Sequence, residues 1–205
     1  MITVDEAVKT ILKNLSILDS ESVKLTDALD RVLATDIYAN CAIPFFDNSA
    51  MDGYAVIASN TQGAAKSSPR ILEVIADLKA GDIARQKLSQ GQAIRIMTGA
   101  MMPEGADSVV MVEDTQRCVI DPVRNTKAIE KKGKISNGVK IFKAAKRSEN
   151  IRRKGEDIKK GELVITKGML LKSAHIGLLA SLGQAEVEVT RKPKVAILAT
   201  GDEVV

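Results

Sequence analysis

Two carboxylates stand close together in the stretch FFDNSAMDGYAV, from Phe45 to Val56. Asp, Asn, Ser and Gly all favour turns, so a plain surface turn is one interpretation. Most of the chain's five aromatic residues gather around it, however: Tyr38, Phe45, Phe46 and Tyr54. A polar loop held on an apolar base uses such residues, and functional loops are often built this way. Asp47 and Asp52 are then candidate magnesium ligands, because Mg²⁺ binds through one or two carboxylates plus substrate phosphates.

A second candidate is IRIMTGAMMPEGAD, residues 94–107. It reads either as a strand that ends in a loop or as an anion-binding turn. In the second interpretation the Thr98 hydroxyl and the backbone N–H groups of Gly99 and Ala100 face an oxyanion. Glycine lets the backbone approach a ligand closely.

A third candidate is ENIRRKGEDIKKGE, residues 149–162, in which Arg152 lies near Asp157. A charge run is usually a solvated face, and that interpretation stays open. Arginine also binds phosphate bidentately, with a nearby acid to orient it. The wider stretch 127–162 has 13 basic and five acidic residues, which favours anions.

The segment ATGDEVV ends the sequence and contains Glu203. It follows an apolar run at 194–200 that predicts a buried strand, and loops after parallel strands commonly bind ligands. His175 falls in the first turn of a predicted helix, where we expect an exposed or capping side chain and no catalytic role.

Two kinds of element must position these residues. Periodicity predicts helices at 3–15, with a capping box of Thr3 and Glu6, at 26–34, capped by Thr26, and at 169–183, capped by Ser173 and stopped by Gly183. Between the second and third helices the pattern changes to short strands, predicted at 71–78, 92–98, 107–115, 139–145 and 161–168. Further strands are predicted at 185–190 and 194–200.

Composition is that of a soluble globular protein, with 45% hydrophobic and 27% charged residues over 205 positions. The net charge of +4 is too small to indicate a partner. Two cysteines and one histidine make a zinc site improbable. The sequence shows no signal peptide and no apolar run long enough for a membrane span, so we expect a cytoplasmic protein without membrane contact.

Together the four stretches resemble the MoeA family, the molybdopterin molybdenumtransferases related to the E domain of gephyrin. FDNSAMDGYAV is close to the family signature, and RIMTGAMMPEGADSVVMVEDT, ENIRRKGEDIKKGE and LATGDEVV are similar to its other recurrent stretches. Met101 and Ala42 stand where the family often has proline. The resemblance implies an α+β fold in which a mixed α/β domain (1–44 and 148–192) carries an inserted β-rich domain (45–147). Residues 193–205 would begin a truncated molybdopterin-binding α/β domain.

The resemblance also implies a reaction. Family members insert molybdenum from molybdate into adenylylated molybdopterin, with Mg²⁺, and release AMP. The positions carried over as catalytic are Asp52, Thr98, Arg152, Asp157 and Glu203. Asp52 and Glu203 are implied as metal ligands, and Ser49, Gly99 and Ala100 as cofactor-binding residues.

Partners follow from the same resemblance: a homodimer with its active cleft between subunits, and molybdopterin adenylyltransferase among the pathway proteins. This chain would then supply one wall of the cleft and be inactive alone. The alternative is a gephyrin-like, non-enzymatic scaffold module. Nucleic-acid binding by the basic stretch is disfavoured, because Phe142 is the only aromatic residue there and no stacking platform is evident.

Overall fold

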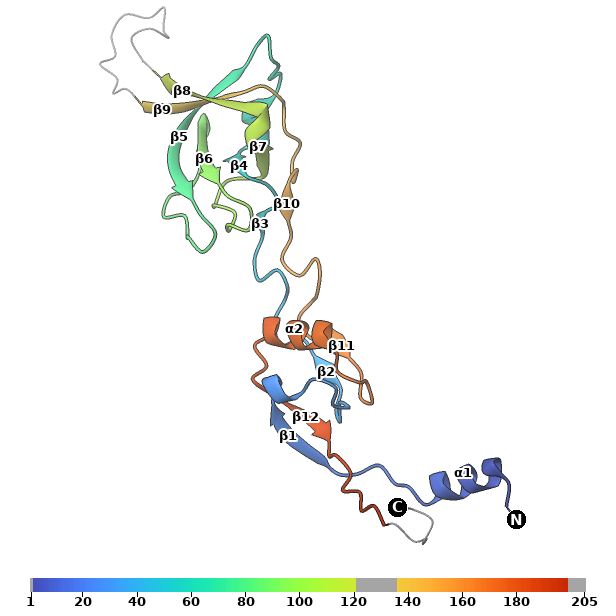
Figure 1. The fold of residues 1–205 in the computed structure, drawn as a ribbon. Coiled ribbons are helices and arrows are strands. Elements are labelled where there is room, and N and C mark those ends of the chain that lie inside the picture. Colours follow the sequence, from blue (N-terminus) through green and yellow to red (C-terminus); the bar gives the residue numbers. More distant parts are fainter. Residues whose placement is uncertain (1, 121–135, 199–205) are drawn as a thin grey trace, which may run out of the picture. The chain divides into compact units, whose positions relative to one another are not determined.

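The computed structural model describes residues 2–120 and 136–198. The chain forms two compact units (Figure 1). Unit 1 combines Met1–Cys41 with Gly161–Val205, and unit 2 is Ala42–Lys160. The predicted boundaries stood at residues 44 and 147, so unit 2 is longer than the expected insertion at its carboxyl end. The whole is an α+β fold with few helices.

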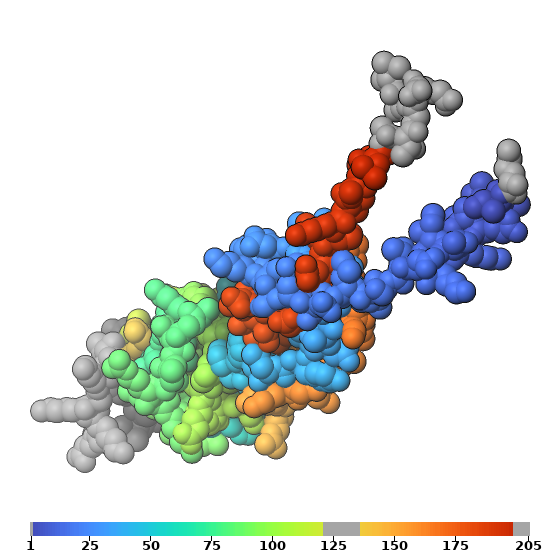
Figure 2. Space-filling model, turned by 90° about the horizontal axis from the view of Figure 1, so that it is seen from below, coloured from blue at the N-terminus to red at the C-terminus, as the bar shows by residue number. Residues whose placement is uncertain are grey.

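Unit 1 is built from both ends of the chain. Its strand β1 (Ser20–Lys24) pairs antiparallel with β12 (Glu186–Thr190), and β2 (Ile37–Tyr38) pairs with β11 (Leu163–Ile165). In Figure 2 the blue and red segments from the two ends lie side by side in this unit. Helix α2 (Ser173–Ser181) packs on a short 3₁₀ turn, η1 (Leu25–Asp27), and contributes Leu179 to the core.

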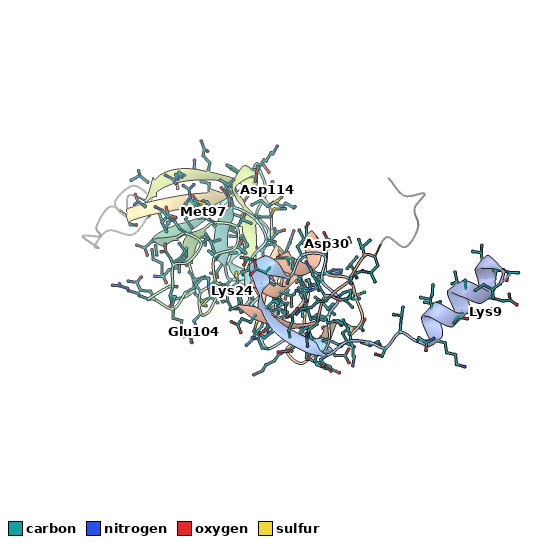
Figure 3. The ribbon with its side chains drawn as sticks, turned by 60° about the horizontal axis from the view of Figure 1, so that its bottom comes forward. Lys9, Lys24, Asp30, Met97, Glu104 and Asp114 are labelled. Carbon is teal, nitrogen blue, oxygen red and sulfur yellow. The ribbon has the colours of Figure 1, made fainter. Side chains whose placement is uncertain are left out.

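The helix termini agree in part with the sequence. Helix α1 (Val4–Lys13) has the predicted capping box of Thr3 and Glu6, and it buries none of its residues. Figure 3 shows side chains, including that of Lys9, around the whole of this helix. In α2 the predicted Ser173 cap is wrong. The His175 Nδ1 accepts the backbone N–H of Lys172 instead, which confirms a capping histidine, and Gly183 follows the helix with φ of 72°.

The helix predicted at 26–34 is wrong beyond η1. Asp30 has a φ of 59°, in the left-handed region, which ends any α-helix there. The N–H of Asp30 then donates to the Leu171 carbonyl, and that of Leu33 donates to Met169. The spacing of apolar residues predicted a helix, but these long-range backbone hydrogen bonds hold the segment in a non-helical conformation. Leu33 is completely buried.

The strand predicted at 194–200 is also absent from the residues that can be described. Residues 191–198 have neither helix nor strand, and Ile197 and Leu198 are almost fully exposed. A strand needs a backbone neighbour, and the described part of the chain offers none there. The remainder of that segment, with Glu203, lies outside the described residues.

Unit 2 contains a six-stranded mixed sheet in the order β7-β4-β6-β5-β9-β8. The strands are β4 (Gly53–Val56), β5 (Arg70–Leu78), β6 (Gln92–Ile96), β7 (Ser108–Met111), β8 (Thr115–Ile120) and β9 (Ser136–Ile141). Two 3₁₀ turns, η2 (Ala58–Thr61) and η3 (Val112–Asp114), connect them. Alternate residues of β4 enter two separate cores: Tyr54 and Val56 one, Ala55 the other.

The strand predictions for this unit are confirmed at 71–78, 92–98 and 107–115, although the last two end earlier than expected. A short additional pair joins β3 (Asn48–Ser49) to β10 (Ile151–Arg152). None of the helices in the described part of the chain is long and apolar enough to cross a membrane.

Candidate functional site

Three of the sequence motifs meet within unit 2. Strand β3 belongs to the first motif and β10 to the third, and their pairing sets Asn48 opposite Arg152. The second motif joins them through a bridge between Asn48 and Met101. Its backbone is also tied to Ser49, which donates to the Ala100 carbonyl and accepts from Gly99. Segments about 50 residues apart along the chain are thus held together by backbone hydrogen bonds.

Asp52 and Thr98 are in direct contact. The backbone N–H and the hydroxyl of Thr98 both donate to Asp52 Oδ1, each at 2.8 Å. The backbone N–H, followed by the hydroxyl, lowers the pKa of the Asp52 carboxyl. Both residues are exposed. Asp52 is therefore a fixed, ionised carboxylate at the surface, and within the described chain its Oδ2 has no hydrogen-bond partner. Figure 3 labels Met97, which precedes Thr98, among the side chains of this unit.

The predicted anion-binding turn is not formed as expected. The N–H of Gly99 donates to Ser49 at 2.9 Å, and the N–H of Ala100 donates to Met97 at 3.0 Å. Neither group is free to cradle an oxyanion in this conformation. Ser49 and Ala100 are completely buried, and the Ser49 hydroxyl donates to the Met51 carbonyl. The donor groups of Ser49, Gly99 and Ala100 thus bond to carbonyls of the first two motifs. These bonds hold the two loops together.

Arg152 forms an ion-pair cluster within its own motif. Its guanidinium group bonds to Asp157, and its Nε donates to Glu156 at 3.1 Å. Asp157, and next Glu156, raise the pKa of Arg152. The Glu156 pKa is lowered, first by the backbone N–H of Arg153 and then by Arg152. The prediction that an acid orients this arginine agrees with the geometry.

Asp47, a candidate magnesium ligand from the sequence, bonds to the third motif through both of its carboxylate oxygens. Its Oδ2 accepts from Arg153 at 2.6 Å, and its Oδ1 accepts the backbone N–H of Lys154 at 2.8 Å. Both oxygens are occupied, so this carboxylate fastens the first motif to the third. Sequence reasoning missed Arg153, which also bonds to Ser148. Residues 152–154 are all basic, and the sequence does not indicate that Arg153 is the one whose side chain bonds to Asp47.

This pairing makes the stability of unit 2 depend on pH. The Lys154 N–H, and next the Arg153 guanidinium, lower the folded-state pKa of Asp47 below 3.8. A lowered folded pKa contributes stability that is present above the unfolded pKa and lost as pH falls through the folded value. Asp47→Asn is expected to destabilise unit 2 by roughly 0.5–1.5 kcal/mol at neutral pH, because one charged partner is lost. Urea unfolding at neutral pH and below the carboxyl pKa measures the difference.

Glu104→Gln is the matched control for that prediction. Glu104 also pairs with a basic side chain, Lys87, but both groups are largely exposed, at 74% and 66%. Its removal is expected to change stability by only a few tenths of a kcal/mol. An Asp47→Asn chain that keeps its full stability, or loses it equally at both pH values, contradicts the structural role of Asp47.

A complete metal site is not formed by the described residues. No three acidic, cysteine or histidine side chains of residues 2–120 and 136–198 lie close enough to hold an ion together. Asp52 offers one carboxylate oxygen of the type Mg²⁺ prefers. The other predicted ligand, Glu203, lies outside the described residues. Asp52 alone does not make a magnesium site.

Comparison with known proteins places this chain in a family. Residues 2–183 match the MoeA N-terminal region, domain I and II, and the chain belongs to the MoeA family. It is 42% identical over 202 residues to the molybdopterin molybdenumtransferase of Bacillus subtilis (strain 168), and 40% identical to that of Staphylococcus epidermidis. These matches cover 98% of this chain and 44% of each relative.

A solved structure has the same fold. The molybdopterin biosynthesis MoeA protein from Pyrococcus horikoshii OT3 matches with a TM-score of 0.78 and 34% identity. The match covers 94% of this chain and 47% of that protein. The chain thus corresponds to a little under half of the relatives' length.

Proposed function

We propose that this chain supplies part of the site at which a molybdopterin molybdenumtransferase inserts molybdenum from molybdate into adenylylated molybdopterin, with release of AMP. The observation that carries the proposal is the fixed Asp52 carboxylate, held by Thr98 where three family motifs meet. The names of relatives that match nearly the whole chain support the reaction class.

The electrostatics of unit 2 suit such a reaction. Molybdate and the substrate's phosphates are all anions, so a site for both must offset their mutual repulsion. Arg152 is positively charged and is oriented by Asp157 and Glu156, and it is the residue we assign to an anionic group of the substrate. Asp52 would contribute one oxygen ligand to Mg²⁺, which when bound offsets phosphate charge. We propose Glu203 as a further Mg²⁺ ligand, on the family resemblance alone.

A chimeric enzyme tests the proposal. The matching region of the Bacillus subtilis relative is replaced by residues 1–205 of this chain, and AMP release from adenylylated molybdopterin is measured with molybdate and Mg²⁺. We expect the chimera to turn over at a rate near that of the parent enzyme and the separate chain to show no turnover, because the chain matches only 44% of the parent.

A folded but inactive chimera would contradict the proposal and favour the scaffold interpretation. Turnover by the separate chain would contradict the proposal that this chain supplies only part of the site. The homodimer implied by the family resemblance stays a prediction, for which light scattering is the measurement.

A further inference from the structure

A cavity lies on the sheet of unit 2. It measures about 330 Å³, within the range of small-molecule sites. Its polar lining comes from five strands: Tyr54 of β4, Asp77 of β5, Arg95 of β6, Arg117 and Cys118 of β8, and Asn137 of β9. Asp52, Thr98, Arg152 and Asp157 do not line it.

Three of these residues form a row across the sheet. Arg95 stands opposite Tyr54 in the antiparallel pair of β4 with β6, and opposite Asp77 in the parallel pair of β5 with β6. Directly paired residues present their side chains on the same face. Arg95 therefore shares one face of the sheet with Tyr54 and Asp77, and Tyr54 belongs to the core on that face.

The charged side chains that line the cavity have no ion-pair or hydrogen-bond partner within the described chain. Neither Arg95 nor Arg117 makes an ion pair or a side-chain hydrogen bond with residues 2–120 or 136–198, and the same holds for Asp77. Arg152 and Arg153, in contrast, are both bonded to carboxylates. The cavity is lined by two guanidinium groups and one carboxylate, so its formal charge is +1. This net positive charge favours an anionic ligand.

Tyr54 gives an independent indication. Only 2% of this residue is exposed, yet it lines the cavity. No side chain or carbonyl of the described residues bonds to its hydroxyl, and this oxygen is reached by solvent, because Asn60 holds the one fully buried side-chain atom without a partner in the described chain. The hydroxyl is therefore available to a ligand seated in the cavity. This also gives the tyrosine of FFDNSAMDGYAV a role besides packing.

We propose that this cavity binds a small organic anion through a carboxylate or phosphate group. Guanidinium groups bind both kinds of oxyanion in bidentate geometry, so Arg95 and Arg117 hold the anionic group. Tyr54 and Asn137 donate further hydrogen bonds to it. Val74 and Ile75 also line the cavity and contact the apolar part of the ligand. The proposal is independent of the transferase function.

Calorimetric titration of the 205-residue chain is the test, with phenyl phosphate, benzoate and uncharged benzamide as probes. We expect saturable binding of phenyl phosphate, benzoate or both, and none of benzamide. Arg95→Gln and Arg117→Gln are each expected to weaken binding about tenfold, and Tyr54→Phe several-fold. The stronger of the two anionic probes identifies the ligand group as phosphate or carboxylate.

Arg147→Gln is the matched control, since Arg147 is 85% exposed and does not line the cavity. It should leave the affinity unchanged. The proposal is overturned if neither anion binds at millimolar concentration, if benzamide binds equally well, or if the Arg95 and Arg117 variants bind like the control.

A second readout needs no substitution. Cys118 lines the cavity, whereas Cys41 belongs to unit 1. Burial raises the pKa of the Cys118 thiol, so alkylation with iodoacetamide is carried out at mildly alkaline pH. The bound probe is expected to slow modification of Cys118 severalfold, as measured by peptide mass spectrometry, and to leave Cys41 unaffected. Equal rates at Cys118 with and without a saturating probe would place the binding elsewhere and overturn the assignment.

Discussion

Asp52→Asn is expected to lower AMP release by the chimeric enzyme about 100-fold or more. Asparagine has the size of aspartate, and its carbonyl oxygen can still accept the two hydrogen bonds from Thr98. The junction of the motifs should therefore survive. The negative charge is lost, and with it the interaction with any cation that accompanies the phosphates. Losing one preorganised electrostatic group in an active site typically costs a factor of this order.

The comparison that isolates this effect has two parts. Glu104→Gln removes one exposed carboxylate of unit 2 that lies outside the site, and it should leave turnover unchanged. Thermal unfolding of the Asp52→Asn chain should coincide with that of the unmodified chain. If the Asp52→Asn chimera turns over within a factor of about three of the unmodified chimera, Asp52 has no role in the reaction.

The sequence singled out segments that meet in the structure, but it did not predict the contacts of each residue. The contact between Asp52 and Thr98 joins two motifs that the sequence singled out separately. The types of Gly99 and Ala100 correctly suggested a tight turn, but not that their N–H groups would bond to Ser49 and Met97. Local residue types predict a turn, whereas the partner of each backbone donor depends on which strand lies beside it.

The same limit explains the wrong elements. Residues 26–34 have helical spacing, and nothing local reveals that Leu33 will donate to the carbonyl of Met169. The helix at 3–15, in contrast, carries its own start signal in Thr3 and Glu6, and it forms where predicted. Local residue patterns predicted this helix and the strands at 71–78, 92–98 and 107–115, whereas the backbone partners of residues 30–33 lie far along the chain and leave no local signal.

Gly53→Ala is the largest stability effect that we expect in unit 2. A Cβ built on Gly53 would lie 2.0 Å from the carbonyl oxygen of Val110, on the paired strand β7. That neighbour is backbone of the edge strand β7 and has no flexible side chain to give way, so the clash can be relieved only if β7 moves away from β4. We expect a loss of about 3 kcal/mol or more in the free energy of unfolding, measured by urea denaturation. The sequence suggested only a turn-forming glycine here.

Gly177→Ala is the control for this substitution. Gly177 lies in helix α2 with nothing within 4 Å of its built Cβ, and alanine there should stabilise by roughly 0.5–1 kcal/mol. If Gly53→Ala were as harmless, the close approach of β4 to β7 would not be what fixes the residue type. Asp52 immediately precedes Gly53, and its own carbonyl accepts the N–H of Val112 at 3.0 Å. Separating β4 from β7 would therefore also strain the backbone bond of Asp52, whereas its contact with Thr98 lies on the other side of β4, where Gly53 pairs with Ile96 of β6. A Gly53→Ala chain that has lost stability but still holds Asp52 against Thr98 is the expected result.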